Sequence, residues 1–274
     1  MKKYHSALIT GGSSGIGLAL AKQLASEGVN VCLLARDEVK LRKAQQEVAS
    51  LVVRKKQRVD ILVCDITNFE NVHQTLEQWT SQSGVPDLVI NSAGAVYPGY
   101  FEELDIEVFH SLMDVNYFGT LHVLAYFIPK MIAQQSGTVV NLASQAGFVG
   151  VFGYSAYGPT KYAVRGLSDV LRAEMKPHKI QVSIVFPPDT QTPQLDFEAP
   201  LKPPETKAIA GKSKILSPEH VAKTILKDVR KGHYVIIPGL EGKVFFRLIN
   251  LLGNLVYPVM DLIISGAQKK TLPE

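Results

Sequence analysis

The amino-acid sequence predicts one α/β domain in which a parallel sheet of seven strands is covered by helices on both faces. Seven short runs rich in apolar and β-branched residues recur along the chain, and segments with helical periodicity separate them. This alternation is typical of a doubly wound parallel sheet. The 274 residues are enough for one large domain and few for two.

The predicted elements follow one another in regular order. The strands are expected at residues 5–10, 29–35, 58–64, 87–93, 137–144, 180–186 and 233–238. The helices are expected at residues 15–27, 37–53, 69–83, 105–134, 155–177 and 217–231. Residues 187–216 hold six prolines and little periodicity, so we predict a long functional loop there.

Composition excludes little but bounds the class of protein. With 46% hydrophobic and 20% charged residues and a net charge of +4, the chain is ordinary for a soluble protein and gives no reason to expect nucleic acid as a partner. Cys32 and Cys64 each lie in an apolar run, which favours free buried thiols over a disulfide or a metal site. The first twelve residues are too weakly apolar for a secretory signal, so we expect a cytoplasmic protein.

A glycine-rich turn joins the first predicted strand to the first predicted helix. The sequence Thr10–Gly17 reads TGGSSGIG, and its glycines permit a tight turn with close backbone approach. The free N–H groups of the following helix can hold a pyrophosphate, although such a sequence can also be a turn alone.

The end of the second predicted strand indicates which dinucleotide binds. An acidic residue there hydrogen-bonds the 2′-hydroxyl of NADH, whereas an arginine accommodates the 2′-phosphate of NADPH. This chain has Arg36 at that position, followed by Asp37. We therefore predict NADPH as the cofactor, with a solvated Arg36 as the alternative interpretation.

Tyr157 and Lys161 are four residues apart, which places a phenol beside an ammonium on a helix. Gly158 and Pro159 lie between them. If Ser155 caps the helix, Pro159 falls near its first turn, where a missing N–H costs little.

These features together resemble the short-chain dehydrogenase/reductase family over nearly the whole chain. The resemblance rests on TGGSSGIG, on Asn91-Ser92-Ala93-Gly94, on Asn116 and Ser144, and on the Tyr157/Lys161 pair. It implies a Rossmann fold, with a catalytic domain over residues 1–240 that includes the substrate loop 187–216, and a C-terminal extension over 241–274.

The resemblance also implies roles for the catalytic residues Asn116, Ser144, Tyr157 and Lys161. Tyr157 would protonate a carbonyl oxygen, with its pKa lowered by Lys161 and the nicotinamide. Ser144 would hold the substrate oxygen, and Asn116 would anchor a water. The implied cofactor-binding residues are Gly11, Ser13, Ser14, Gly15, Ile16, Gly17, Arg36, Asp65, Ile66, Asn91, Ala93, Gly94, Tyr157, Lys161, Pro187, Thr190 and Thr192.

The segment after the sixth predicted strand narrows the substrate. Its sequence, Pro187-Pro188-Asp189-Thr190-Gln191-Thr192-Pro193, is similar to that of the 3-ketodihydrosphingosine reductases, which use NADPH on the C3 ketone of a long-chain base precursor. Alternatives are a reductase of another lipid-like ketone (retinoid, steroid or fatty-acyl) and a non-catalytic NADP(H)-sensing binding protein.

The C-terminal stretch 244–265 has a broad apolar face. Its polar breaks at Arg247, Asn250, Asn254, Pro258, Asp261 and Ser265 recur every three or four residues. A transmembrane span would not carry these residues. We predict two amphipathic segments hinged at Pro258 that lie on the cytosolic face of a membrane, with burial between subunits as the alternative. The family resemblance further implies a homodimer or homotetramer.

Overall fold

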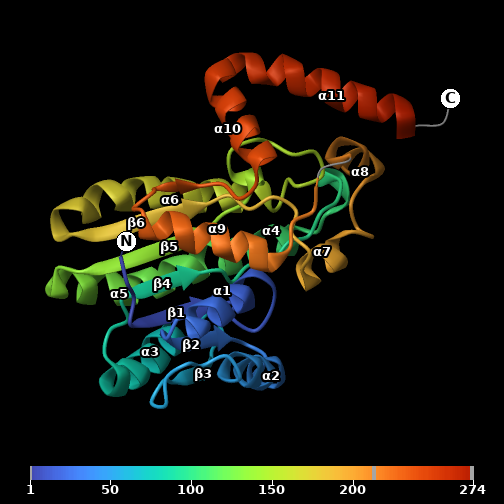
Figure 1. Cartoon of the computed structure of the whole chain (residues 1–274). Helices are drawn as coiled ribbons and strands as arrows, with labels where there is room; N and C mark the ends of the chain where they lie inside the picture. The colour runs from blue at the N-terminus through green and yellow to red at the C-terminus, as the bar shows by residue number, and fades with distance from the viewer. Residues whose placement is uncertain (1, 212–213, 272–274) are drawn as a thin grey trace.

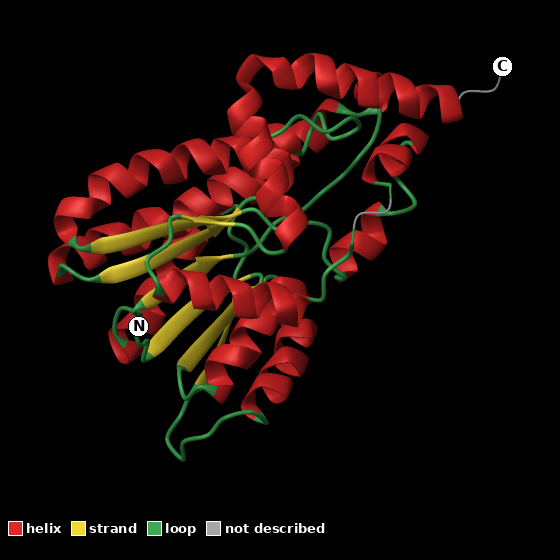
Figure 2. Cartoon of the chain, turned by 45° about the horizontal axis from the view of Figure 1, so that its top comes forward, coloured by secondary structure: helices red, strands yellow, loops and turns green. Residues whose placement is uncertain are grey.

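The computed structural model describes residues 2–211 and 214–271. Residues 212–213 of the predicted loop and 272–274 of the predicted extension therefore lie outside it. All seven predicted strands are present and form one parallel sheet in the order β3-β2-β1-β4-β5-β6-β7 (Figure 1, Figure 2). Their bounds are β1 Ser6–Thr10, β2 Asn30–Ala35, β3 Val59–Val63, β4 Leu88–Asn91, β5 Gly137–Leu142, β6 Ile180–Val185 and β7 Val235–Ile236.

Helices pack on both faces of the sheet, as the sequence predicts. One face is covered by α1 (Gly15–Ser26), α2 (Glu38–Ala49) and α9 (Pro218–Arg230), whose apolar side chains join one core cluster. The other is covered mainly by α3 (Phe69–Ser83), α5 (Gly119–Gln134) and α6 (Gly158–Met175). The central strands β1, β4 and β5 are almost completely buried because both of their faces are covered.

The predicted helix 105–134 is divided by a π-helical segment. It consists of α4 (Ile106–Met113), the segment Asp114–Phe118 and α5. Such bulges occur often at functional sites. Here the bulge carries Asn116, whose side chain is buried.

Two short helices occupy the segment 187–216, where the sequence predicted a loop. They are α7 (Pro193–Glu198) and α8 (Pro204–Ala210). Thr192 caps α7 by accepting a hydrogen bond from the Leu195 N–H, and Pro193 occupies the first helical position. The loop prediction was wrong because these helices are too short to show apolar periodicity.

The first turn of α6 also differs from the expected one. The helix begins at Gly158 with Tyr157 as its N-cap, and Pro159 occupies the second helical position. Ser155 does not cap the helix, and its hydroxyl is buried without a hydrogen-bond partner in the described part of the chain. The Tyr157 carbonyl instead accepts from the N–H groups of Thr160 and Lys161, at 3.1 and 3.4 Å.

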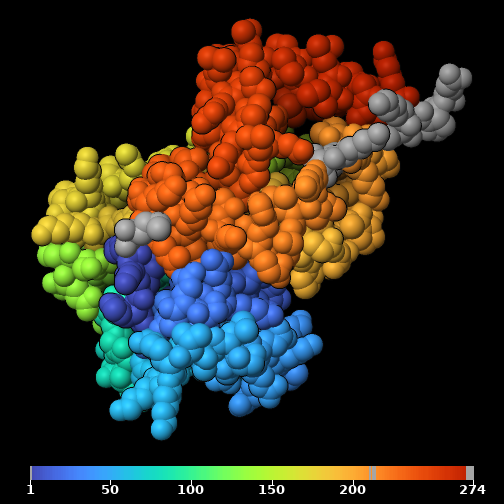
Figure 3. Space-filling model, viewed as in Figure 1, coloured from blue at the N-terminus to red at the C-terminus, as the bar shows by residue number. Residues whose placement is uncertain are grey.

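The C-terminal extension forms two helices, α10 (Leu240–Leu252) and α11 (Val256–Thr271), joined by a 3₁₀ turn at Gly253–Leu255. The bend lies at Gly253, which has a φ of +52°, and not at Pro258, which is in the first turn of α11. The predicted hinge at Pro258 was therefore wrong, because a proline in the first helical turn removes no intrahelical hydrogen bond. Figure 3 shows both helices above the body of the molecule, with α11 over α8.

Candidate active site

A cavity of about 1360 Å³ lies at the carboxyl ends of the strands. Its walls include the residues that follow β1, β2, β3, β4, β5 and β6 in the chain. Parallel strands present their carboxyl ends at one edge of the sheet, and this edge is where doubly wound folds bind ligands. The sequence order of the strands therefore brings distant segments of the chain into one site.

The glycine-rich turn leaves no room for a side chain at Gly11 or Gly17. A Cβ at Gly17 would lie 2.3 Å from the Gly11 carbonyl oxygen, and a Cβ at Gly11, whose φ is +65°, would lie 2.8 Å from the Ala93 backbone. The N-cap of α1, Ser14, makes no side-chain hydrogen bond to the first-turn N–H groups. These groups face a cavity lined by residues 13–17, so the turn fits a pyrophosphate.

Two cations and two carboxylates line the cavity beside α2. Arg36 and Lys40 line it, and the Arg36 guanidinium lies 3.9 Å from the Asp65 carboxylate. Asp37 caps α2 by accepting a hydrogen bond from the Lys40 N–H, and this bond lowers the pKa of its carboxyl. Asp37 therefore both caps α2 and pairs with the Lys40 ammonium at 3.3 Å, and the two cations beside this part of the cavity each have a carboxylate neighbour.

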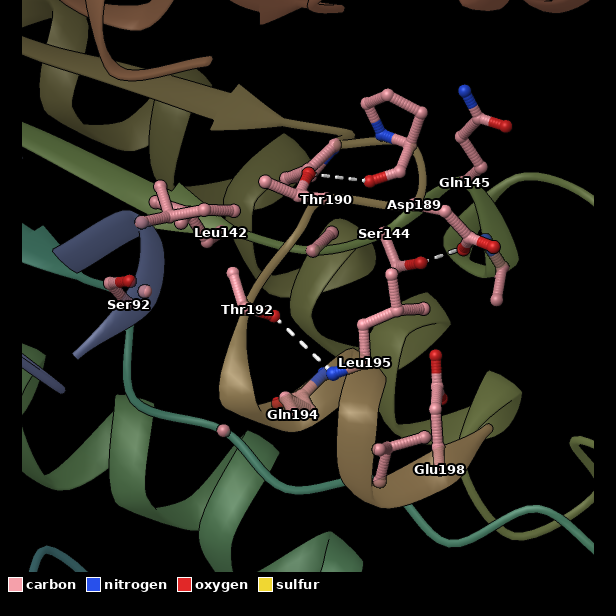
Figure 4. A pocket seen from close by; sticks show the side chains of 18 of the residues that line it. Ser92, Leu142, Ser144, Gln145, Asp189, Thr190, Thr192, Gln194, Leu195 and Glu198 are labelled. Carbon is pink, nitrogen blue, oxygen red and sulfur yellow. Dashed lines mark hydrogen bonds between the residues drawn. The ribbon is translucent and has the colours of Figure 1, made fainter. Parts of the chain in front are cut away.

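Three of the four side chains predicted to be catalytic line the cavity. These are Ser144, Tyr157 and Lys161, and Ser144 acts to lower the pKa of the Tyr157 phenol. The Lys161 ammonium lies 5.5 Å from the centre of the Tyr157 ring and donates to the Leu142 carbonyl oxygen. Figure 4 shows the Ser144 hydroxyl, which accepts a hydrogen bond from the Ala146 N–H at 3.2 Å.

Burial shifts the pKa values of the tyrosine and the lysine in opposite senses. It raises the pKa of Tyr157, and the neighbouring Ser144 and Gln194 side chains offset this only in part. Burial lowers the pKa of Lys161 to about 8. The expected lowering of the Tyr157 pKa is therefore not a property of the protein alone, in which the phenol stays protonated at neutral pH.

Asn116 lies behind the cavity wall, where its amide joins two segments of the chain. Its Oδ1 accepts from the Ala95 N–H at 2.8 Å, and its Nδ2 donates to the Ala95 carbonyl and to the Thr160 hydroxyl, both at 2.9 Å. These bonds use both amide protons and tie the chain after β4 to the start of α6. The role of Asn116 in holding a water stays a prediction.

The other predicted cofactor residues lie in or next to the cavity. Asn91 is behind its wall, where it donates to Asn141 Oδ1, so the structure assigns it to support of the sheet. Thr192 packs on the glycine turn, since a Cβ at Gly15 would lie 3.1 Å from its methyl group. Apart from Tyr157 and Lys161, the predicted cofactor residues that line the cavity are Gly11, Ser13, Ser14, Gly15, Ile16, Gly17, Arg36, Asp65, Ile66, Ala93, Gly94, Pro187, Thr190 and Thr192.

A group of polar residues on α7 and next to it also lines the cavity and was not predicted from the sequence. Gln194, Glu198, Asp189 and Lys202 all line the cavity, and Gln194 acts to lower the pKa of Tyr157. Glu198 and Lys202 are four residues apart and form an ion pair of 3.1 Å. Thr192-Pro193, an N-cap residue followed by proline, is the helix-start signal that could have placed them.

The opposite part of the cavity wall is apolar. Phe245 of α10 and Met260 and Ile263 of α11 line it, together with Val149 and Val151. Phe245 and Phe246 also pack against Phe148, with ring centroids 5.9 and 5.0 Å apart. The C-terminal helices are therefore part of the wall and not a detached tail.

Comparison with known proteins agrees with this geometry. The model of the short chain dehydrogenase family matches residues 5–200. The chain belongs to the short-chain dehydrogenase family. Its solved neighbours include a short-chain dehydrogenase from Sphingobium yanoikuyae in complex with NADPH, which is 26% identical, has a TM-score of 0.77 and aligns over 93% of this chain and 95% of its own.

Within that family the chain is similar to two curated enzymes of one kind. It is 42% identical to the 3-ketodihydrosphingosine reductase of Dictyostelium discoideum, over 84% of this chain and 73% of the relative. It is 39% identical to the 3-dehydrosphinganine reductase of Danio rerio, over 86% of this chain and 71% of the relative.

Proposed function

We propose that this protein uses NADPH to reduce the C3 ketone of 3-ketodihydrosphingosine to the alcohol dihydrosphingosine, a step of sphingolipid biosynthesis. The observation that carries the proposal is the similarity to reductases of this name over more than four fifths of the chain. The Ser144, Tyr157 and Lys161 cluster at the centre of the cavity supplies the chemistry for ketone reduction.

The residues around the cavity fit NADPH. The N-terminus of α1 would hold the pyrophosphate, and Arg36 and Lys40 would hold the 2′-phosphate, with Asp37 engaged in capping α2. Lys161 would hold the nicotinamide ribose; its Nζ lies close to Gly94, where a Cβ would be 3.3 Å from it. When bound, NADPH supplies a hydride to the ketone carbon.

The chain's own residues complete the reduction by supplying a proton. Ser144 holds the carbonyl oxygen, and Tyr157 donates its phenolic proton to that oxygen as negative charge develops there. The high pKa of Tyr157 keeps this proton available at neutral pH. The charged Lys161 stabilises the phenolate that remains, and solvent returns the proton after the alcohol leaves.

The apolar C-terminal helices support a location of the site at a membrane surface. Residues 240–269 have the length and hydropathy of a membrane span, but the bend at Gly253 divides them into helices of 13 and 16 residues, shorter than the roughly 20 needed to cross. We infer that they lie in the interface on the cytosolic face, so that a lipid chain enters the cavity between them. The exposed apolar residues are Leu240, Val244, Leu248, Leu251, Leu255, Tyr257, Val259, Leu262 and Ile263.

The protein assembles as a homodimer or homotetramer through α5 and α6, the helices that this family often pairs. Tyr162 and Val170 of α6 are exposed apolar residues available for such an interface. Light scattering of the purified protein measures the oligomeric state, and a monomer at micromolar concentration would contradict this part of the proposal.

The decisive experiment is an assay of the purified protein with 3-ketodihydrosphingosine and either NADPH or NADH. We expect cofactor oxidation with formation of dihydrosphingosine, and a strong preference for NADPH. If only retinoid, steroid or fatty-acyl ketones are reduced, the protein is a reductase of another lipid. If no ketone is reduced although NADPH binds, the protein is a cofactor-sensing binding protein.

A further inference from the structure

A buried charge cluster lies next to the proposed proton donor. The Glu198 carboxylate is 6% exposed. It accepts a hydrogen bond from the Tyr154 hydroxyl at 3.1 Å and pairs with the Lys202 ammonium at 3.1 Å. Lys202 lies 3.4 Å from the Asp189 carboxylate. Two carboxylates therefore share one ammonium, and the cluster carries one negative charge when both are ionised; burial raises the pKa of Glu198, so a second cation would stabilise its charged form.

The negative charge is close to the reacting centre. The ring of Tyr154, which bonds Glu198, lies 5.7 Å from the ring of Tyr157. Glu198 and Asp189 both raise the pKa of Tyr157. In Figure 4 the Glu198 side chain points toward the space below Ser144, which is where we expect the bound ketone. Lys161, a second cation beside Tyr157, donates to the Leu142 carbonyl and belongs to the proposed cofactor side.

A buried carboxylate with incomplete compensation favours a cationic ligand, because charge pairing in a site shielded from water is stronger than at the surface. The substrate of the proposed function carries an ammonium at C2, directly beside the C3 carbonyl. A carbonyl held by Ser144 and Tyr157 therefore places that ammonium within reach of the neighbouring wall. Retinoid, steroid and fatty-acyl ketones carry no such cation.

We propose that Glu198, assisted by Asp189, binds the C2 ammonium of the substrate and so selects a 2-amino ketone over other long-chain ketones. This inference rests on the proposed function, which it deepens by assigning the residues that recognise the amine. The polar head then lies against α7, and the alkyl chain extends along the apolar wall of Phe245, Met260 and Ile263.

The test compares two substrates in three forms of the protein. The substrates are 3-ketodihydrosphingosine and its analogue in which hydrogen replaces the C2 amine. The forms are the wild type, Glu198→Gln and the control Glu205→Gln. Glu205 is also a buried glutamate, 5% exposed, but it bonds Tyr100 and does not line the cavity.

We expect the wild type to have the higher kcat/KM for the amino ketone. Loss of one charged partner typically reduces an interaction by about 10- to 100-fold, so Glu198→Gln should reduce the preference by that factor, mainly through KM, with little change for the analogue. Glu205→Gln should retain the wild-type preference. Asp189→Asn, at a partly exposed position, should reduce the preference in the same direction and replaces Glu198→Gln if that variant does not fold.

Three outcomes would overturn the inference, and they are distinguishable. Equal turnover of both ketones by the wild type would show that the protein does not recognise the ammonium, and it would leave the proposed function unchanged. An equal loss for both ketones in Glu198→Gln assigns this residue to general support of the site. Reduction of the analogue alone refutes both the inference and the proposed function.

Discussion

At the scale of single residues, the site depends on how α6 begins. Tyr157 is the N-cap, and its carbonyl accepts the first bonds of the helix from Thr160 and Lys161. Pro159 has no N–H to donate, and in the first turn none is needed. The helix can therefore start directly after the tyrosine, which places Lys161 one turn away and buried beside it.

The first prediction concerns the Tyr157 hydroxyl. Tyr157→Phe keeps the buried ring and removes the proton donor, so kcat/KM for the ketone should fall by about 10²- to 10⁴-fold with NADPH affinity nearly unchanged. Tyr162→Phe is the control, because Tyr162 is on the same helix but 43% exposed and outside the cavity. Full activity of Tyr157→Phe would contradict the assigned mechanism.

The second prediction concerns the stability of the protein without cofactor. Burial lowers the pKa of Lys161 from 10.5, its value in an unfolded chain, to about 8 in the fold, so between these two pH values the unfolded chain binds more protons and stability rises with pH. Below about pH 8 Lys161 is charged in the folded state, so the whole energetic penalty for burying its charge is present. Lys161→Met removes that charge and should raise the free energy of unfolding at pH 7 by no more than about 3 kcal/mol, since one pKa unit is about 1.4 kcal/mol.

This stabilisation should diminish as the pH rises from about 8 to 10.5, and Lys161→Met should lose reductase activity at every pH. Thermal unfolding of both forms across this range measures the effect. The kcat/KM of the wild type should also decrease above about pH 8, where Lys161 loses its proton. A stability difference independent of pH would show that the lysine charge is not the cause.

At the scale of elements, the segment after β6 is where sequence reasoning failed. Residues 187–216 were expected to be a loop. Instead, α7 carries Gln194 and Glu198, and Lys202 lies between α7 and α8; all three line the cavity. A helix of six or seven residues has too few turns to show a periodic apolar face. The burial of its charged residues depends on contacts with distant segments, such as the Tyr154–Glu198 hydrogen bond.

The third prediction concerns the C-terminal helices. Leu251 and Leu255 are 83% and 66% exposed, so Leu251→Glu/Leu255→Glu should leave the fold intact and weaken binding to liposomes by at least about tenfold, given about 1.5–3 kcal/mol for each buried leucine. Flotation with anionic liposomes measures this. Deleting the helices would be a poorer test, because Phe245 and Phe246 pack on the core and their removal would expose it.

The control for this variant is Val53→Glu/Val63→Glu. It adds the same charge at two exposed valines beside β3, at the opposite end of the molecule from α10 and α11 (Figure 1). It should bind liposomes as the wild type does. If both variants lose binding equally, general charge repulsion explains the loss and the C-terminal helices are not the contact.

At the scale of the whole molecule, the cavity joins segments from both ends of the chain. The glycine turn after β1 contacts Thr192, and Gly242 of α10 lies so close to Gln145 that a Cβ would be 2.6 Å from its amide nitrogen. The cofactor region and the C-terminal helices therefore share one framework. Binding of cofactor should stabilise the molecule as a unit.

The fourth prediction follows from that coupling. NADPH at 100 times its Kd should stabilise the protein by about 2.7 kcal/mol, which raises Tm by roughly 5–10 °C for a chain of this size. NADH at the same concentration should raise Tm much less, because Arg36 and Lys40 have no 2′-phosphate to bind. Arg36→Ala should reduce the difference between the two cofactors, and equal shifts from NADPH and NADH in the wild type would refute the assignment of Arg36.

The sequence by itself determined the seven strands, the glycine turn and the Tyr157/Lys161 pair, because apolar periodicity and fixed spacing are local properties. It did not determine that Ser155 does not cap α6, that the C-terminal bend lies at Gly253, or that α7 carries a buried carboxylate to the site. Only the tertiary structure decided these, since the first and the last depend on packing against distant segments and the bend depends on the backbone conformation that Gly253 adopts. The same long-range packing brings Glu198 to the proposed proton donor, beside the place where we expect the substrate amine.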